Sequence, residues 1–178
     1  DAAIAGQQFV ISPWLDESLR KSYDDVLRFM EVFNKCGELC KAQGMKFGYH
    51  NHDFEFKTVI NNQKLYDIIL QHTDPELVAQ QLDMGNLYDG GAVAIAIVMQ
   101  YPGRFELMHV KDEIKATSGT EPFESTILGQ GIVGTKQVCD QGRKTGTRCF
   151  IIEQESYQGK APLDCSRADL EIMKKWGY

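Results

Sequence analysis

Apolar residues along the chain fall into two kinds of pattern, short continuous runs and longer stretches with helical spacing. The run at residues 8–12 stops at Pro13, and Ser22 then opens a long stretch in which apolar residues recur at helical spacing until Gly44. A short apolar run bounded by turn residues predicts a buried strand, and helical spacing predicts an amphipathic helix. The chain therefore begins with a strand followed by a helix.

The same strand and helix order recurs along the rest of the chain. The later strands are expected at residues 45–50, 77–82, 105–110 and 148–153, and the later helices at residues 65–70, 91–100 and 135–145. A closing helix is expected to be capped by Ser166 and to bury Leu170, Met173 and Trp176, while residues 113–131 are expected to be irregular. Five such units of uniformly apolar strands predict a parallel sheet that is covered on both faces.

Composition limits the class of protein. The 178 residues are 43% apolar and 25% charged, which is typical of one globular domain over residues 1–178. A net charge of -6 without a basic stripe argues against nucleic acid as a partner. The longest apolar run, at residues 92–99, is too short to span a bilayer, so no membrane association is expected. A homo-oligomer is compatible with the sequence.

The cysteines and the N-terminus bear on the compartment. None of the five cysteines has the CxxC spacing of a zinc or redox motif, and free thiols favour the cytoplasm. The first residues contain neither an initiator methionine nor a signal peptide. A periplasmic location therefore stays open, because a signal could have been lost with preceding sequence.

Polar residues gather where four successive strands are expected to end. The sequences are GYHNHDFEF at residues 48–56, QLDMGN at 81–86, MHVKDE at 108–113 and IIEQE at 151–155. The carboxyl ends of parallel strands meet at one rim, so these segments predict convergence of His50, Asp83, His109 and Glu153. Two imidazoles and two carboxylates suit one divalent cation: Mn²⁺, Zn²⁺, Co²⁺, Fe²⁺ or Mg²⁺. No glycine-rich nucleotide motif follows a strand.

Strand alternation pairs each expected ligand with a second polar residue on the same face. The pairs are His50 with His52, His109 with Lys111, and Glu153 with Glu155. A single histidine at a strand end is more often structural than a ligand. The coincidence at four strand ends favours a metal site.

These motifs, in this order and spacing, resemble the sugar phosphate isomerase/epimerase family of xylose isomerase-like TIM barrels over nearly the whole chain. The resemblance implies an α/β fold, a (β/α)8 barrel of which this chain is the C-terminal part, about strands four to eight, without the N-terminal three βα units. It implies metal ligands at Asp83, His109 and Glu153. Many relatives have a glutamate at the first ligand position, where this chain has His50, with His52 as its rival.

The resemblance also implies a reaction. A metal-dependent isomerase or epimerase would remove a proton beside the carbonyl of a sugar or keto-sugar, and the cation would stabilise the enediolate. Glu153 would be ligand and base, and His52, Glu155 or Lys111 would be the second proton carrier. Because His50 stands where two-base epimerases have a carboxylate, a one-base isomerisation fits better, or the alternative of a lyase or hydratase acting on 3-keto sugars. Neutralisation of acids at the rim is an equally good role for Lys111.

Three residues are expected to bind the small-molecule sugar: Asn86, Trp14 and Glu155. Formation of a turn would also explain Asn86, and packing beneath the rim would also explain Trp14. A non-catalytic carbohydrate-binding barrel is a competing hypothesis. An abasic-site endonuclease is disfavoured, because the chain is acidic and has only four histidines.

Overall fold

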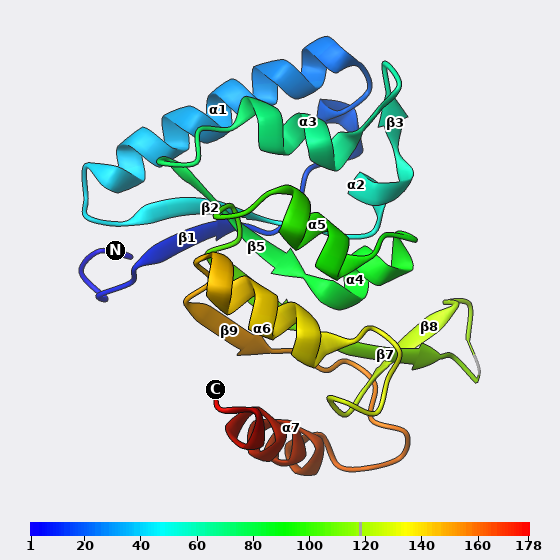
Figure 1. Ribbon diagram of the computed structural model, residues 1–178. Coiled ribbons are helices and arrows are strands. Elements are labelled where there is room, and N and C mark those ends of the chain that lie inside the picture. The colour runs from blue at the N-terminus through cyan, green and yellow to red at the C-terminus, as the bar shows by residue number, and fades with distance from the viewer. Residues whose placement is uncertain (118) are drawn as a thin grey trace. The chain divides into compact units, whose positions relative to one another are not determined.

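The computed structural model describes residues 1–117 and 119–178, which divide into two compact units, residues 1–81 and 82–178. Both units are built from parallel strands and the helices that follow them (Figure 1). This confirms the predicted order of strands and helices. A single incomplete barrel over residues 1–178 stays a prediction.

Three parallel strands form the sheet of the first unit. They are β1 (Phe9–Ser12), β2 (Lys46–His50) and β5 (Val78–Asp83), in the order β1-β2-β5. In this register Phe9 pairs with Lys46, and His50 pairs with Gln81. The last two residues of β5, Leu82 and Asp83, belong to the second unit. The strand therefore carries the chain from one unit into the next.

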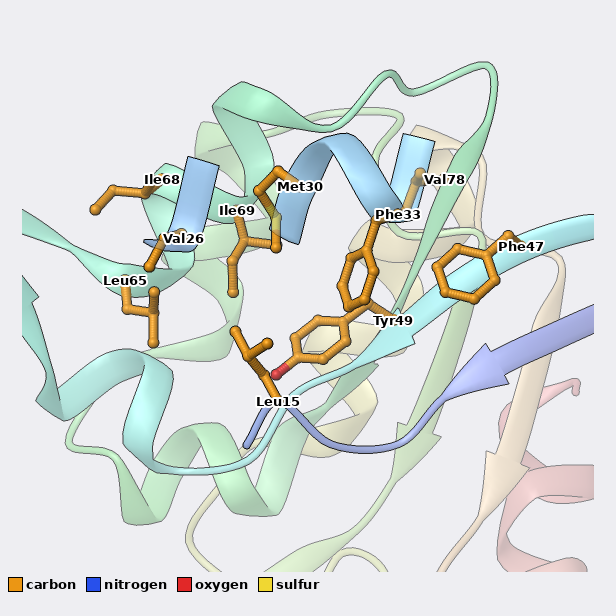
Figure 2. Close-up of a cluster of buried hydrophobic side chains, with 10 residues drawn as sticks. All are labelled: Leu15, Val26, Met30, Phe33, Phe47, Tyr49, Leu65, Ile68, Ile69 and Val78. Carbon is orange, nitrogen blue, oxygen red and sulfur yellow. The ribbon is translucent and has the colours of Figure 1, made fainter. Parts of the chain in front are cut away.

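Two helices cover one face of this sheet. Helix α1 (Tyr23–Lys41) begins at Ser22, whose side chain accepts the backbone N–H of Asp25, and α3 (Leu65–His72) packs beside α1. Figure 2 shows the core that they form with the strands: Leu15, Val26, Met30, Phe33, Phe47, Tyr49, Leu65, Ile68, Ile69 and Val78. Since Phe47 and Tyr49 face the helices, strand alternation turns His50 to the opposite face. Short elements complete the unit: η1 (Glu17–Leu19), α2 (Phe54–Lys57), β3 (Val59–Ile60) and β4 (Gln63–Lys64).

The second unit pairs β6 (Leu107–Val110) with β9 (Cys149–Ile152) in parallel, with His109 opposite Ile151. Its helices are α4 (Met84–Asp89), α5 (Ala94–Gln100), α6 (Thr135–Thr145) and α7 (Pro162–Trp176). Helix α6 has the predicted bounds, and glycines in the left-handed region, Gly134 and Gly146, flank it. No helix of the described residues has both the length and the hydropathy needed to cross a membrane.

Three local predictions were wrong. The segment expected to be irregular contains an antiparallel hairpin of β7 (Asp112–Lys115) and β8 (Phe123–Thr126). Helix α7 begins at Pro162, whose missing N–H costs nothing in a first turn, so Ser166 lies inside the helix and donates its hydroxyl to the Pro162 carbonyl. Leu170 is 46% exposed, and the buried face of α7 consists of Cys165, Asp169 and Met173.

Candidate metal centre

Asp83 lies at the end of β5 and caps the helix that follows. Its Oδ1 atom accepts the backbone N–H of Asn86 at 2.7 Å, which satisfies a free donor in the first turn of α4. The side chain is fully buried, and burial raises the pKa of Asp83 to about 6 against the opposing charge of Lys111. Burying a carboxylate is costly unless a positive charge compensates it. The position therefore suits a ligand to a cation.

His109 and Glu153 meet at the ends of neighbouring strands. His109 lies on β6, and Glu153 follows β9, where its backbone N–H bonds the Val110 carbonyl and extends the strand ladder. The Nδ1 atom of His109 contacts the Oε2 atom of Glu153 and lies 3.8 Å from the Oδ2 atom of Asp83. One imidazole nitrogen thus lies close to two carboxylates. Nitrogen and oxygen donors of this kind fit Zn²⁺ or Mn²⁺.

Lys111 is a buried cation beside these carboxylates. Its Nζ atom pairs with Glu155, lies 3.7 Å from the Oε1 atom of Glu153, and donates to the Asn86 side chain at 3.2 Å. Burial alone would lower the pKa of Lys111, but the carboxylates of Asp83, Glu155 and Glu153 raise it above its usual range. These contacts support a role in charge neutralisation, one of the two roles predicted for Lys111. They also place the predicted residues Asn86 and Glu155 next to Lys111.

Glu113 is a buried acid that the sequence interpretation missed. The side chain is 2% exposed and lies against α4, where a Cβ atom at Gly85 would come within 2.6 Å of its Oε1 atom and 2.8 Å of Lys111. Burial raises the pKa of Glu113 to about 8, with Asp89 adding to the effect and Lys111 opposing it. Strand alternation was the signal that could have identified Glu113, because His109, Lys111 and Glu113 lie two residues apart. The glycine leaves room for both side chains beside the candidate ligands.

A serine from the hairpin fixes the segment that carries Glu155. The Oγ atom of Ser125 in β8 accepts the backbone N–H groups of Glu155 at 2.7 Å and Ser156 at 2.8 Å. Ser125 itself is buried. The predicted irregular segment therefore contributes directly to the arrangement of the site, and its role was not visible in the sequence.

In the first unit, His50 is the last residue of β2, and His52 lies two residues further along the chain. The Nδ1 atom of His50 lies 3.1 Å from the side-chain oxygen of Gln81, its partner in the strand register. The two imidazole rings meet edge to face at 5.0 Å. The shared face that alternation predicted for the two histidines fits this contact.

Trp14 packs on the second of these histidines. Its ring meets the ring of His52 at 4.6 Å and that of Phe54 at 5.0 Å, and Trp14 remains 50% exposed. The guanidinium of Arg20 covers Phe54 at 3.9 Å. The contacts with His52 and Phe54 fit the predicted packing role, and the exposed part of the ring fits the predicted stacking on a sugar.

Glu55 holds the turn between β2 and α2. It is fully buried, accepts the Tyr49 hydroxyl at 2.5 Å and accepts the backbone N–H of His52 at 2.9 Å. Burial raises the pKa of Glu55 to about 7, although these hydrogen bonds oppose the effect. These contacts give Glu55 a structural role, because they fix the turn that carries His52.

Parallel strands followed by helices, with polar groups at the strand ends, are typical of (β/α) barrels. Within this class, the chain belongs to the xylose isomerase-like TIM barrel family, whose model matches residues 2–176. The fold class and the family inferred from the sequence are therefore confirmed.

Individual relatives match the chain over different lengths. An inosose dehydratase from Clostridium perfringens is 35% identical over 82 residues, which cover 46% of this chain and 27% of that protein. A solved sugar phosphate isomerase/epimerase from Parabacteroides distasonis superposes with a TM-score of 0.84 at 24% identity, covering 97% of this chain and 59% of that one. A solved protein named IOLI, with a bound zinc atom, gives a TM-score of 0.73 at 13% identity, covering 98% and 64%. The chain therefore spans less than two thirds of each relative, and the two solved structures show likeness of fold alone.

Proposed function

We propose that the protein is a metal-dependent lyase that removes water next to the carbonyl of a keto-sugar or related keto-polyol. The observation that carries the proposal is the approach of the His109 imidazole to the carboxylates of Asp83 and Glu153. The name of the curated relative, an inosose dehydratase, favours the lyase over the isomerase or epimerase. The zinc atom bound to the IOLI protein agrees with a divalent cation.

His50 is proposed as the fourth ligand. It pairs in register with Gln81, and alternation puts Gln81 on the same face of β5 as Asp83. His50, Asp83 and His109 each offer one atom that could bind a metal ion, and three such atoms are enough for a site. A neutral imidazole in place of a carboxylate leaves one base fewer for a symmetric epimerisation. Elimination needs only one base at the substrate carbon, so this substitution also favours the lyase.

Each of these residues would have a separate role in the reaction. A bound divalent cation would polarise the substrate carbonyl and stabilise the negative charge that develops on its oxygen. Glu153 would accept the proton from the carbon beside the carbonyl. His52 would donate a proton to the departing hydroxyl, which leaves as water. Lys111 would balance the charge of Glu153 and Glu155, and Asn86 and Trp14 would bind hydroxyl groups and the ring of the substrate.

Mass spectrometry of the products separates the candidate functions. A set of keto-polyols is incubated with Mn²⁺-, Zn²⁺- or Co²⁺-loaded protein, and the products are compared with the starting material. The lyase predicts loss of one water and a conjugated carbonyl product with new ultraviolet absorbance. A product of unchanged mass would instead establish an isomerase or epimerase. Sugar binding without conversion would establish the non-catalytic barrel.

A further inference from the structure

We propose that the substrate of this site is uncharged, a free keto-polyol that carries neither a phosphate nor a carboxylate group. The inference rests on the proposed function, because it names the substrate class of that site. Two features of the second unit support it. The first is a group of converging backbone N–H donors, here called the cradle, which could bind an anion but bind the side chain of Asp112 instead. The second is Lys111, which is already paired with acids.

The first feature is the glycine-rich loop before α6. The Oδ2 atom of Asp112 accepts the backbone N–H groups of Gly129 at 2.8 Å and Gly131 at 3.1 Å. Its Oδ1 atom accepts those of Val133 and Glu113, both at 3.1 Å. Four backbone donors thus converge on one carboxylate that is 1% exposed. Convergent N–H groups of this kind bind phosphate in other proteins.

This loop lies where related barrels often bind a phosphate group, so the group that its N–H donors bind here bears on the substrate. Phosphate sites of (β/α) barrels are often built from the loops after the seventh and eighth strands. The resemblance aligns β6 and β9 with those strands, and the cradle lies in the connection that follows β6. In this chain the donors that could hold a substrate phosphate are instead bonded to Asp112.

The cradle is also closed to a larger anion. A Cβ atom added at Gly131 would lie 2.3 Å from the Oδ1 atom of Asp112 and 2.5 Å from the Glu113 carbonyl oxygen. The loop therefore wraps the carboxylate at close range. A phosphate could use these donors only if Asp112 left its place.

The second feature is the charge around the candidate ligands. Lys111 is bonded to Glu155 and lies near Glu153, so its charge is already balanced. The acids around this lysine and its neighbour Glu113 are Asp83, Asp89, Glu153 and Glu155.

Two other basic residues of the second unit, Arg148 and Lys136, are paired away from the candidate ligands. The Arg148 side chain pairs with Glu106 before the start of β9, at the end of the strand opposite Glu153. The Lys136 side chain pairs with Asp140 on the exposed surface of α6. Even with a divalent cation bound, these four acids outweigh the cation and the single lysine, so an anionic substrate would be disfavoured. Hydroxyl groups could instead accept hydrogen bonds from Lys111 and donate them to the acids.

A matched pair of ligands tests the inference. The metal-loaded protein is given a keto-polyol and its monophosphate, and total consumption is measured whatever the product, with calorimetric binding of the same pair alongside. We expect kcat/KM, or affinity, to favour the uncharged compound by about 100-fold. Preference for the monophosphate overturns the inference, as does binding of neither compound.

The two proposals fail in different ways. Consumption of the uncharged compound without loss of water refutes the lyase but leaves the charge preference intact. Loss of water from the monophosphate alone refutes the charge preference but leaves the lyase intact.

Two variants test whether Asp112 is the reason that the cradle does not bind phosphate. Asp112→Ala empties the cradle, and we expect inorganic phosphate to bind this variant at least tenfold more tightly than wild type. Asp169→Ala is the control, because Asp169 accepts the Leu128 N–H at 2.9 Å in the same loop, and its loss disturbs the loop without emptying the cradle. Equal phosphate binding by wild type and both variants would contradict the role of Asp112. If Asp112→Ala fails to fold, the wild-type comparison of the ligand pair still decides the substrate class.

Discussion

The Oδ2 atom of Asp83 lies 3.8 Å from the Nδ1 atom of His109, although the two residues come from different strands. The same imidazole nitrogen contacts Glu153, so one point near the strand ends is bordered by a nitrogen and two carboxylates. A proton can bridge only two of these groups, whereas a divalent cation could bind all three. Substitutions at these residues and their neighbours test this arrangement.

Replacing the buried lysine should destabilise the protein far more than replacing an exposed one. The Lys111 side chain is 5% exposed and faces several carboxylates, so Lys111→Met leaves buried negative charge uncompensated. We expect the metal-free protein to lose about 3 kcal/mol of its free energy of unfolding. Lys136→Met is the control, because this 48% exposed partner of Asp140 should contribute less than about 1 kcal/mol. Urea unfolding of both variants measures the difference, and equal losses would contradict the burial argument.

The stability of the protein should depend on pH through Glu55. The pKa of this acid is about 7 in the folded protein against an ordinary value of 4.5, so the folded state binds the proton more tightly. The stabilising contribution of the protonated form is present below about pH 4.5 and is lost as the pH rises to about 7. The free energy of unfolding should fall over this range by at most about 1.4 kcal/mol per pH unit from this group.

Glu55→Gln should remove that part of the slope, since the amide can still accept the Tyr49 hydroxyl. Glu38→Gln, on the exposed surface of α1, should leave the slope unchanged. Chemical unfolding between pH 4.5 and 8 compares the three proteins. An identical slope in wild type and Glu55→Gln would refute this assignment.

Ser125 should support the site from the hairpin. Ser125→Ala removes the acceptor of two backbone N–H groups, which should cost about 1–3 kcal/mol and loosen the segment around Glu155. Because Glu155 pairs with Lys111, we also expect a lower kcat. Ser166→Ala, which removes only one exposed bond to the Pro162 carbonyl, should change neither quantity by much. Unchanged activity in a folded Ser125→Ala variant would show that the hairpin does not position the site.

The sequence predicted the elements whose apolar spacing is regular. Helix α6 was predicted at its observed bounds, since Val138 and Cys139 supply the buried spacing and glycines flank it. Alternation also predicted that His109 shares a face with Lys111, and Glu153 with Glu155. The contacts of His109 with Glu153 and of Lys111 with Glu155 fit this arrangement.

The elements that were missed are held by polar contacts. The hairpin of β7 and β8 buries Asp112, Glu113, Ser125 and Thr126, none of which gives an apolar pattern. Asp112 is buried because distant backbone N–H groups surround it, and Glu113 because Gly85 lacks a side chain. Such burial depends on residues remote in sequence, so local spacing could not predict it.

Metal content measured by mass spectrometry tests the central claim most directly. Wild-type protein, dialysed after loading with Zn²⁺ or Mn²⁺, should retain one divalent ion per chain, whereas Asp83→Asn and His109→Gln should each retain little or none. Asp164→Asn, in an exposed ion pair with Arg167, is the control and should retain the wild-type amount. A wild-type protein that holds no ion after loading, or ligand variants that hold as much as wild type, would contradict the proposed metal centre.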